Sequence, residues 1–210
     1  MYISARTGQI ANDMVAATTF ALEVAEVVEE ATGSELSVWQ GTLGTPMGML
    51  SWSSQVESFA EAATREQKLM ESAQYIEMVQ QAGNAGLFVP GSLDNHFARV
   101  LHSAGPQGPV EYIQMIQARV ATGKLPDALA FATDMADYAS DLTGNQVTVA
   151  GSNWGDPGTM IFFTGHASAD SVDASQDATM GDAGYQERLA RAADIFVDGT
   201  AVAQLAKRLR

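Results

Sequence analysis

The amino-acid sequence repeats itself at long range, and no other feature constrains the fold as strongly. Residues 20–33 read FALEVAEVVEEATG, and residues 131–144, which lie 111 positions later, read FATDMADYASDLTG. Such self-similarity indicates two copies of one structural unit. The matches continue in order through a pair of G-x-P segments to Tyr75 and Tyr185, where the offset falls to 110. The chain is therefore expected to fold as two similar halves.

The joint between the halves is rich in glycine and proline. Residues 105–109 read GPQGP, a composition typical of a connector. We therefore predict a first domain over residues 1–104, a linker over 105–110 and a second domain over 111–210.

Both halves predict the same order of elements. Apolar residues recur every three or four positions in the helical segments, strand segments alternate, and the G-x-P segments are typical of hairpin turns. In the first half we expect strands at Met1–Arg6, Glu35–Thr42, Met47–Ser53 and Phe88–Val89, and helices at Gln9–Ala31, Gln55–Ala82 and Leu93–Leu101. In the second half we expect strands at Glu111–Val120, Gln146–Asn153, Thr159–His166 and Phe196–Val197, helices at Pro126–Leu142, Asp182–Ala193 and Ala201–Leu209, and a loop at Ala167–Gly181.

The order strand, helix, strand, strand, helix, strand is that of the ferredoxin-like α+β unit. Its two helices cover one face of the sheet and leave the other face without a partner. A second copy in the same chain supplies that partner, so sheet is expected to pack on sheet. The predicted fold class is α+β, with two tandem βαββαβ repeats.

Composition narrows the classes of partner. The chain of 210 residues is 46% hydrophobic, carries a formal net charge of −14 and has no cysteine. An acidic surface repels phosphate groups and anionic lipid, so neither nucleic acid nor a membrane is expected as a partner. Without cysteine, disulfides and thiolate chemistry are excluded. No signal peptide or long apolar run is found, so we predict a cytoplasmic protein.

This organisation resembles the dimeric α+β barrel superfamily, which includes antibiotic-biosynthesis monooxygenases, NIPSNAP-like proteins, haem-degrading oxygenases and related stress proteins. The resemblance rests on the element order and the repeat, and it implies an intramolecular barrel with a ligand pocket between helices and sheet. It also implies a monooxygenase-like activity on an aromatic or phenolic substrate that itself reduces oxygen. Haem-binding members place an axial histidine on a helix. The four long helices predicted here contain no histidine, so no cofactor and no metal is expected.

Three residues are candidates for catalysis. His166 ends a predicted strand beside a glycine, where an imidazole could face a pocket and act as a base. Asn153 and Trp154 lie at the second hairpin and could complete a polar and aromatic set. The competing interpretation makes His166 a partly exposed residue at a strand end and Trp154 a packing residue.

Aromatic and arginine side chains are candidates for substrate binding. The aromatic candidates are Trp52, Tyr75, Phe163 and Tyr185, and each could instead fill the core. Trp52 and Phe163 are expected to occupy equivalent positions. Two arginines near the ends of the first strands, Arg6 and Arg119, could each clamp a carboxylate or phenolate. Each could instead pair with one of 25 acidic side chains.

Two functions therefore stay open. The first is a small-molecule enzyme of the monooxygenase-like kind, and the second is a non-catalytic binding or assembly protein of the same fold. We expect either a monomeric pseudo-dimer or a homo-oligomer.

Overall fold

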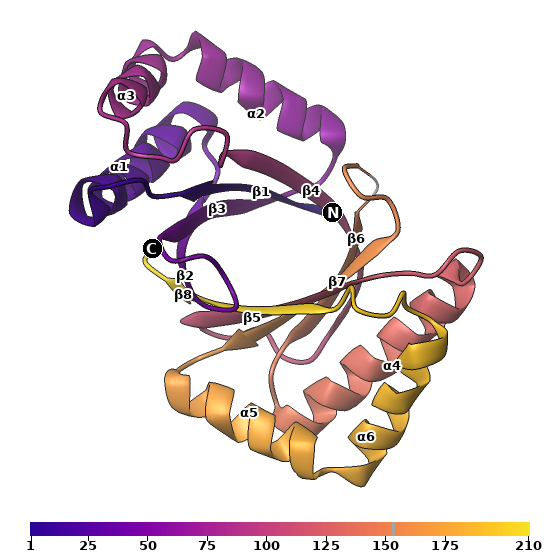
Figure 1. The fold of residues 1–210 in the computed structure, drawn as a ribbon. Helices are drawn as coiled ribbons and strands as arrows, with labels where there is room; N and C mark the ends of the chain where they lie inside the picture. The colour runs from indigo at the N-terminus through magenta and orange to yellow at the C-terminus, as the bar shows by residue number, and fades with distance from the viewer. Residues whose placement is uncertain (153) are drawn as a thin grey trace. The chain divides into compact units, whose positions relative to one another are not determined.

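The computed structural model describes residues 1–152 and 154–210, which form two compact units (Figure 1). Unit 1 comprises Met1–Phe97 and Lys207–Arg210, and unit 2 comprises Ala98–Ala206. Two strands are shared: β4 (Asp94–Ala104) begins in unit 1 and ends in unit 2, and β8 (Val202–Arg208) does the reverse. The domain boundaries expected from the repeat stay a prediction. A domain folds independently, and this property is separate from the compactness of the two units.

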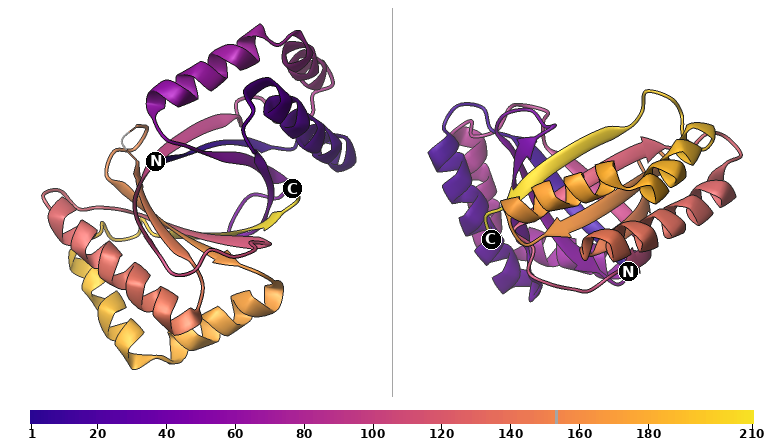
Figure 2. Two further views of the ribbon diagram at one scale, coloured as in Figure 1. Left: turned by 180° about the vertical axis from the view of Figure 1, so that it is seen from behind. Right: turned by 90° about the horizontal axis from the view of Figure 1, so that it is seen from below.

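Unit 1 is a sheet with helices on one of its faces. Its remaining elements are β1 (Tyr2–Gln9), α1 (Met14–Thr32), β2 (Ser37–Leu43), β3 (Met49–Val56), α2 (Phe59–Glu71) and α3 (Ala73–Asn84). Strand β3 pairs antiparallel with both β1 and β2, so Trp52 lies opposite Arg6 on one side and Val38 on the other. The core is made by Leu50 and Trp52 of β3 together with the small residues of α1. Figures 1 and 2 show α1, α2 and α3 on the same side of these strands.

Unit 2 repeats this arrangement. Its remaining elements are β5 (Tyr112–Arg119), α4 (Leu125–Thr143), β6 (Val147–Ser152), β7 (Thr159–His166), α5 (Ala169–Gly181), α6 (Ala183–Ala190) and a 3-10 helix (Arg191–Asp194). Strand β7 pairs antiparallel with β5 and β6, and β6 also pairs with β4. The core packs Phe131 and Met135 of α4 against Val149 and Met160 of the sheet.

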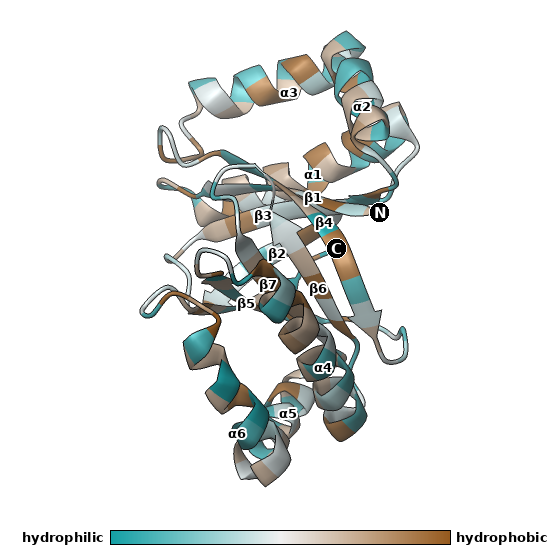
Figure 3. Ribbon diagram, turned by 90° about the vertical axis from the view of Figure 1, so that its right-hand side faces the viewer, coloured by the Kyte–Doolittle hydropathy of each residue, from teal (hydrophilic) through white to brown (hydrophobic). Residues whose placement is uncertain are grey.

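Capping residues mark the ends of the helices. Asp13 caps α1 by accepting a hydrogen bond from the backbone N–H of Ala16, so α1 begins later than predicted. Gly33 and Gly144 close α1 and α4 with φ of 72° and 71°, as the shared Thr-Gly pair predicts. Hydrophilic and hydrophobic residues are interspersed along α3 (Figure 3), as expected of a helix with one face covered by the rest of the unit.

The strands follow the hydrogen-bonding order β1-β3-β2-β8-β5-β7-β6-β4 in a closed barrel. Both halves have the element order strand, helix, strand, strand, helical pair, strand. The predicted α+β class with two tandem ferredoxin-like βαββαβ repeats is confirmed.

The short helices predicted at the end of each half are wrong. Residues 93–101 and 201–209 fall largely within strands β4 and β8, and Phe88 and Phe196 make only isolated bridges. Leu93, Phe97 and Leu101 are spaced four residues apart, which is a helical period. Pairing with strands far away in the sequence overrides this local pattern.

The second helical regions also differ from the prediction. The segment Gln55–Ala82, expected as one helix, contains the end of β3 and two helices that meet at Ser72, whose side chain caps α3. The loop predicted at Ala167–Gly181 is helix α5. It begins at Ser168, which forms a reciprocal capping box with Ser171.

The register of the hairpins changes one predicted equivalence. Val38 pairs with Trp52 in unit 1, whereas Val149, which aligns with Val38, pairs with Phe162 in unit 2. The first hairpin is therefore one residue longer, and the counterpart of Trp52 is Phe162. Because neighbouring residues of a strand point to opposite faces, the predicted counterpart Phe163 lies on the wrong face of β7.

Gly105, at the start of the predicted linker, gives a test of local packing. Its φ is +83°, and a Cβ there would lie 2.0 Å from Ser140 Oγ and 2.8 Å from the carbonyl oxygen of Asn145. We expect Gly105→Ala to lower the free energy of unfolding by about 2–4 kcal/mol, measured by urea denaturation. Gly108→Ala is the matched control, because nothing lies within 4 Å of its Cβ position. Equal unfolding midpoints for the two variants would contradict this reading.

Candidate ligand pocket in unit 1

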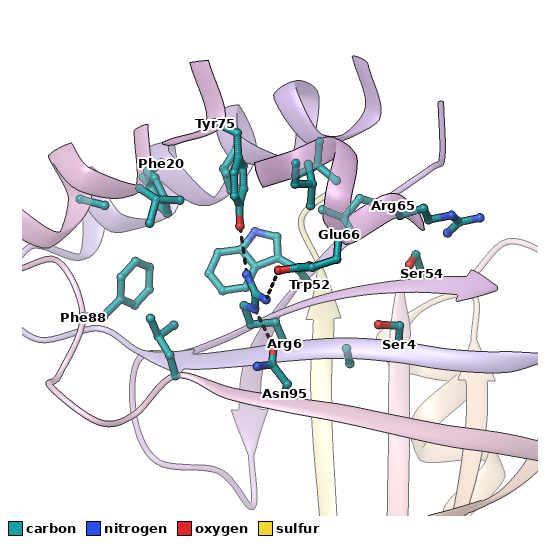
Figure 4. A pocket seen from close by; sticks show the side chains of 18 of the residues that line it. Ser4, Arg6, Phe20, Trp52, Ser54, Arg65, Glu66, Tyr75, Phe88 and Asn95 are labelled. Atoms are coloured by element: carbon teal, nitrogen blue, oxygen red, sulfur yellow. Dashed lines mark hydrogen bonds and ion pairs between the residues drawn. The ribbon is translucent and has the colours of Figure 1, made fainter. Parts of the chain in front are cut away.

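Unit 1 contains a pocket of about 480 Å³ between its sheet and its helices (Figure 4). Strands β1 and β3 supply Ser4, Arg6, Trp52 and Ser54, and all three helices of the unit contribute side chains. Pockets of roughly 300–1,000 Å³ hold small organic molecules. The pocket therefore lies between helices and sheet, as the resemblance to the barrel proteins implies.

Arg6 is a charged group of this pocket that three neighbouring side chains hold in place. Its Nε donates a hydrogen bond of 2.7 Å to Asn95 Oδ1, and its Nη1 donates one of 3.0 Å to the hydroxyl oxygen of Tyr75. Its Nη2 lies 3.8 Å from Glu66 Oε1, and both of these side chains are partly exposed. Partners from β4, α3 and α2 thus hold one guanidinium, as Figure 4 shows.

The guanidinium of Arg6 keeps donors for a ligand. Arginine has five N–H groups, and only two are used by Asn95 and Tyr75. The Tyr75 oxygen accepts from Arg6, so its own O–H is oriented away from that bond and can donate to a ligand. Two parallel donors on a planar cation are suited to a carboxylate or a phenolate oxygen.

Aromatic side chains form the apolar wall of the pocket. Phe88 packs edge-on against Phe20 and Trp52, with ring centroids 5.8 Å and 5.9 Å apart. The indole N–H of Trp52 donates a hydrogen bond of 3.0 Å to the carbonyl oxygen of Ala21 on α1. Trp52 therefore offers a ligand its ring rather than its N–H group.

Helix α1 sets the length of the pocket. Phe20, Val24, Val28 and Thr32 all line it and follow one another at steps of four residues. Twelve residues of helix extend about 18 Å. The space is therefore elongated, and the side chains of α1 that line it are mainly apolar.

Unit 2 does not repeat the charged part of this arrangement. Arg6 lies opposite Trp52, and the residue opposite Phe162, the counterpart of Trp52, is Ile116. Tyr185 occupies the place of Tyr75, since both are the third residue of their helices. An anion would find no arginine at this place in unit 2.

Neither His166 nor Trp154 lines the unit 1 pocket, and the catalytic role of the predicted residues stays a prediction. His166 is fully buried beside Asn145 in unit 2. Its predicted place at a partly exposed strand end is wrong, because α5 covers this end of β7. Trp154 is 52% exposed. Asn153 lies outside the described residues.

The remaining candidates of unit 2 lie apart from one another. Tyr185 packs against the unit 2 core, and burial raises the pKa of its hydroxyl. Arg119 is exposed, and its Nε lies 3.6 Å from Asp156 Oδ1. Phe163 points to the face of β7 opposite the one that packs on the helices. Their role in substrate binding stays a prediction, as does that of Arg6, Trp52 and Tyr75 in unit 1.

The burial of His166 predicts a pH dependence of stability. Burial lowers the pKa of its imidazole below the ordinary 6.5, and a hydrogen bond with the backbone of Ser171 offsets part of this effect. The unfolded chain therefore binds a proton below pH 6.5 that the folded chain does not. We expect the free energy of unfolding to fall below that pH by up to about 1.4 kcal/mol per pH unit.

His166→Leu tests this dependence, since leucine cannot titrate. The variant should lose less stability than the unmodified protein between pH 7 and pH 5, measured by urea denaturation at each pH. Parallel pH profiles for the two proteins would contradict the assignment.

Sequence reasoning did not select most of the residues that line the pocket, and four polar ones lie near Arg6. Asn95 and Glu66 contact Arg6, and Ser4 and Ser54 line the pocket beside it. The alternation of β1, which places Ser4 and Arg6 on one face, is a signal that could have identified Ser4. Asn95 lies 89 positions from Arg6, and its segment was expected to be helical.

The described residues contain neither a metal-binding cluster nor a membrane-spanning helix. No group of three or more histidine, aspartate or glutamate side chains in the described residues is arranged to hold a metal ion. The three histidines lie on strands β4 and β7. Within the same residues, no helix combines the length and the apolar character needed to cross a membrane.

Solved structures share this architecture. A protein described as a candidate monooxygenase from Fusobacterium nucleatum superposes with a TM-score of 0.72 over 100% of this chain and 92% of its own, at 9% identity. The chain has the dimeric α+β barrel fold. Two other proteins with this dimeric α+β barrel fold are an anthrone oxidase-like protein and a candidate monooxygenase from Lactobacillus acidophilus.

The anthrone oxidase-like protein has a TM-score of 0.70 and 12% identity, with 100% of this chain and 91% of that chain covered. The Lactobacillus acidophilus protein has a TM-score of 0.67 and 9% identity, with 99% and 93% covered. No protein-family model matches the sequence, and no curated protein matches it. These likenesses therefore establish the dimeric α+β barrel fold alone.

Proposed function

We propose that the pocket of unit 1 binds a flat aromatic molecule with an anionic oxygen, and that the protein oxygenates it in a monooxygenase-like reaction. The observation that carries this proposal is Arg6, which is fixed by Asn95 and Tyr75 in a pocket with aromatic walls of Phe20, Phe88 and Trp52. A guanidinium group in these surroundings favours a ligand that combines an anionic group with a large apolar ring system.

The position of Arg6 also suits the chemistry. A cation beside a bound phenol or ketone lowers the pKa of that group and so favours the phenolate or enolate. Such an anion can pass electrons to O2. One oxygen atom then becomes a carbonyl oxygen on the substrate carbon, and the other leaves as water with the two hydrogens of that carbon. The substrate is thus the reductant, and the name of the anthrone oxidase-like neighbour is in keeping with this type of reaction.

Binding and oxygen uptake test the proposal. We expect 2-naphthoate to bind with a stoichiometry of one per chain in a calorimetric titration, because Ile116 replaces the arginine in unit 2. With anthrone, we expect one O2 to be consumed for each anthraquinone formed, without an added reductant. Absence of binding, or two equal sites per chain, would contradict the proposed site.

The alternative function is that of a non-catalytic binding protein. Saturable binding without oxygen uptake beyond the rate in buffer would favour this alternative and would refute the oxygenase part of the proposal.

A further inference from the structure

The pocket of unit 1 has a second polar position next to Arg6. Ser4 and Arg6 are two residues apart on β1, so they point to the same face, about 7 Å from each other along the strand. Ser4 pairs directly with Ser54 of β3, and both serines line the pocket. Figure 4 shows the two hydroxyls on the same side of the strands as Arg6.

Both hydroxyls are open to a ligand. The side chains of Ser4 and Ser54 are half-buried, and neither makes a hydrogen bond within the described part of the chain. A hydroxyl can donate one hydrogen bond and accept two. A pair of serines can therefore receive either a hydroxyl or a carbonyl group.

Packing leaves only one direction along β1 for a ligand held at Arg6. In the other direction the next residue on the same face is Gly8. A Cβ at Gly8 would lie 2.8 Å from Leu93 Cδ2 and 3.2 Å from Phe88 Cδ1, so this side is filled by apolar side chains. The ligand therefore extends from Arg6 towards Ser4.

Charge at the serine end favours a neutral group. Arg65, which also lines the pocket, donates to the backbone carbonyl oxygen of Gln55 and forms a close ion pair with Glu61. The hydrogen bond from the Glu57 backbone N–H and this ion pair lower the pKa of Glu61, so its carboxylate stays charged. Arg65 is thus held in a close ion pair, whereas Glu66 lies 3.8 Å from Arg6 without a hydrogen bond, so a second anionic group would gain less at Arg65 than the first gains at Arg6.

We infer that the ligand of this site is a fused-ring aromatic anion with a neutral hydroxyl or carbonyl group at the opposite end, received by Ser4 and Ser54. This inference rests on the proposed function, because it takes the anionic end to be at Arg6. It narrows the substrate class from aromatic anions in general to those that carry a second, neutral oxygen function at the opposite end of the fused rings.

Two probes that differ by one hydroxyl test the inference. In 6-hydroxy-2-naphthoate the carboxylate and the hydroxyl occupy opposite ends of the two rings. We expect it to bind the unmodified protein about 3–10-fold more tightly than 2-naphthoate, the effect of one additional hydrogen bond. Naphthalene-2,6-dicarboxylate, which brings a second charge to the serines, should bind more weakly than the hydroxylated probe.

Variants identify the groups responsible. In the double variant Ser4→Ala/Ser54→Ala the ratio of the two dissociation constants should fall to about one. Ser51→Ala is the matched control, because Ser51 lies on the same strand as Ser54 but points to the other face. This control should keep the ratio of the unmodified protein.

Failure of the serine subsite and failure of the Arg6 site give different results. If 2-naphthoate binds but the hydroxyl adds no affinity, or if the ratio survives in the double variant, the inference about Ser4 and Ser54 is wrong. If neither naphthoate binds the unmodified protein, the proposed function is itself overturned, and this inference falls with it.

Discussion

Replacing Trp52 by alanine is expected to lower the free energy of unfolding by about 3–5 kcal/mol. The side chain is 7% exposed, packs in the core of unit 1 and contacts Phe88 edge-on. Its N–H also satisfies the carbonyl oxygen of Ala21, so truncation removes both apolar burial and a buried hydrogen bond. Urea denaturation of the full chain measures the effect.

Two further variants make this result specific. Trp154→Ala should change stability by less than about 1 kcal/mol, because that side chain is 52% exposed. Trp52→Phe introduces the residue that unit 2 has at the same place and should cost less than Trp52→Ala. Equal losses for Trp52→Ala and Trp154→Ala would contradict the core position of Trp52.

Replacing Arg6 by methionine is expected to weaken the binding of 2-naphthoate by about 10–150-fold. The change removes the cation and the donors proposed to hold the carboxylate, and hydrogen bonds to charged groups are worth about 1.5–3 kcal/mol. Arg6→Lys keeps the charge but loses the planar fork, so we expect an intermediate affinity. Calorimetric titration of each variant gives the dissociation constants.

Arg99→Met is the matched control for this experiment. Arg99 is an exposed arginine of β4 in unit 2, and it does not line the unit 1 pocket. Its replacement removes one positive charge from the same acidic chain, so it reports any general electrostatic effect. If Arg6→Met and Arg99→Met have equal effects on binding, the anion is not held by Arg6.

The repeated units could be predicted from the sequence because their cores follow local periods. The stripe of α1 and the Thr-Gly pair at its end recur in α4, and both glycines adopt the predicted left-handed conformation. The strands β4 and β8 could not be predicted in this way. Their segments have helical spacing, and what makes them strands is pairing with residues far away in the sequence.

The candidate site was predictable only in part. Arg6, Trp52 and Tyr75 were identified for their side-chain chemistry, and the structure brings these three together around one pocket. Asn95 carries no signal in the sequence, since its importance comes from a partner 89 positions away. His166 was misplaced because the segment after it was expected to be a loop. The capping serines at its start make that segment helix α5 instead.

A crystal structure of the complex with 2-naphthoate tests the central claim most directly. The account predicts one ligand per chain in the unit 1 pocket, with a carboxylate oxygen within hydrogen-bond distance of the Arg6 guanidinium and the rings against Trp52. A ligand bound elsewhere, or one bound in this pocket with its carboxylate away from Arg6, would contradict it.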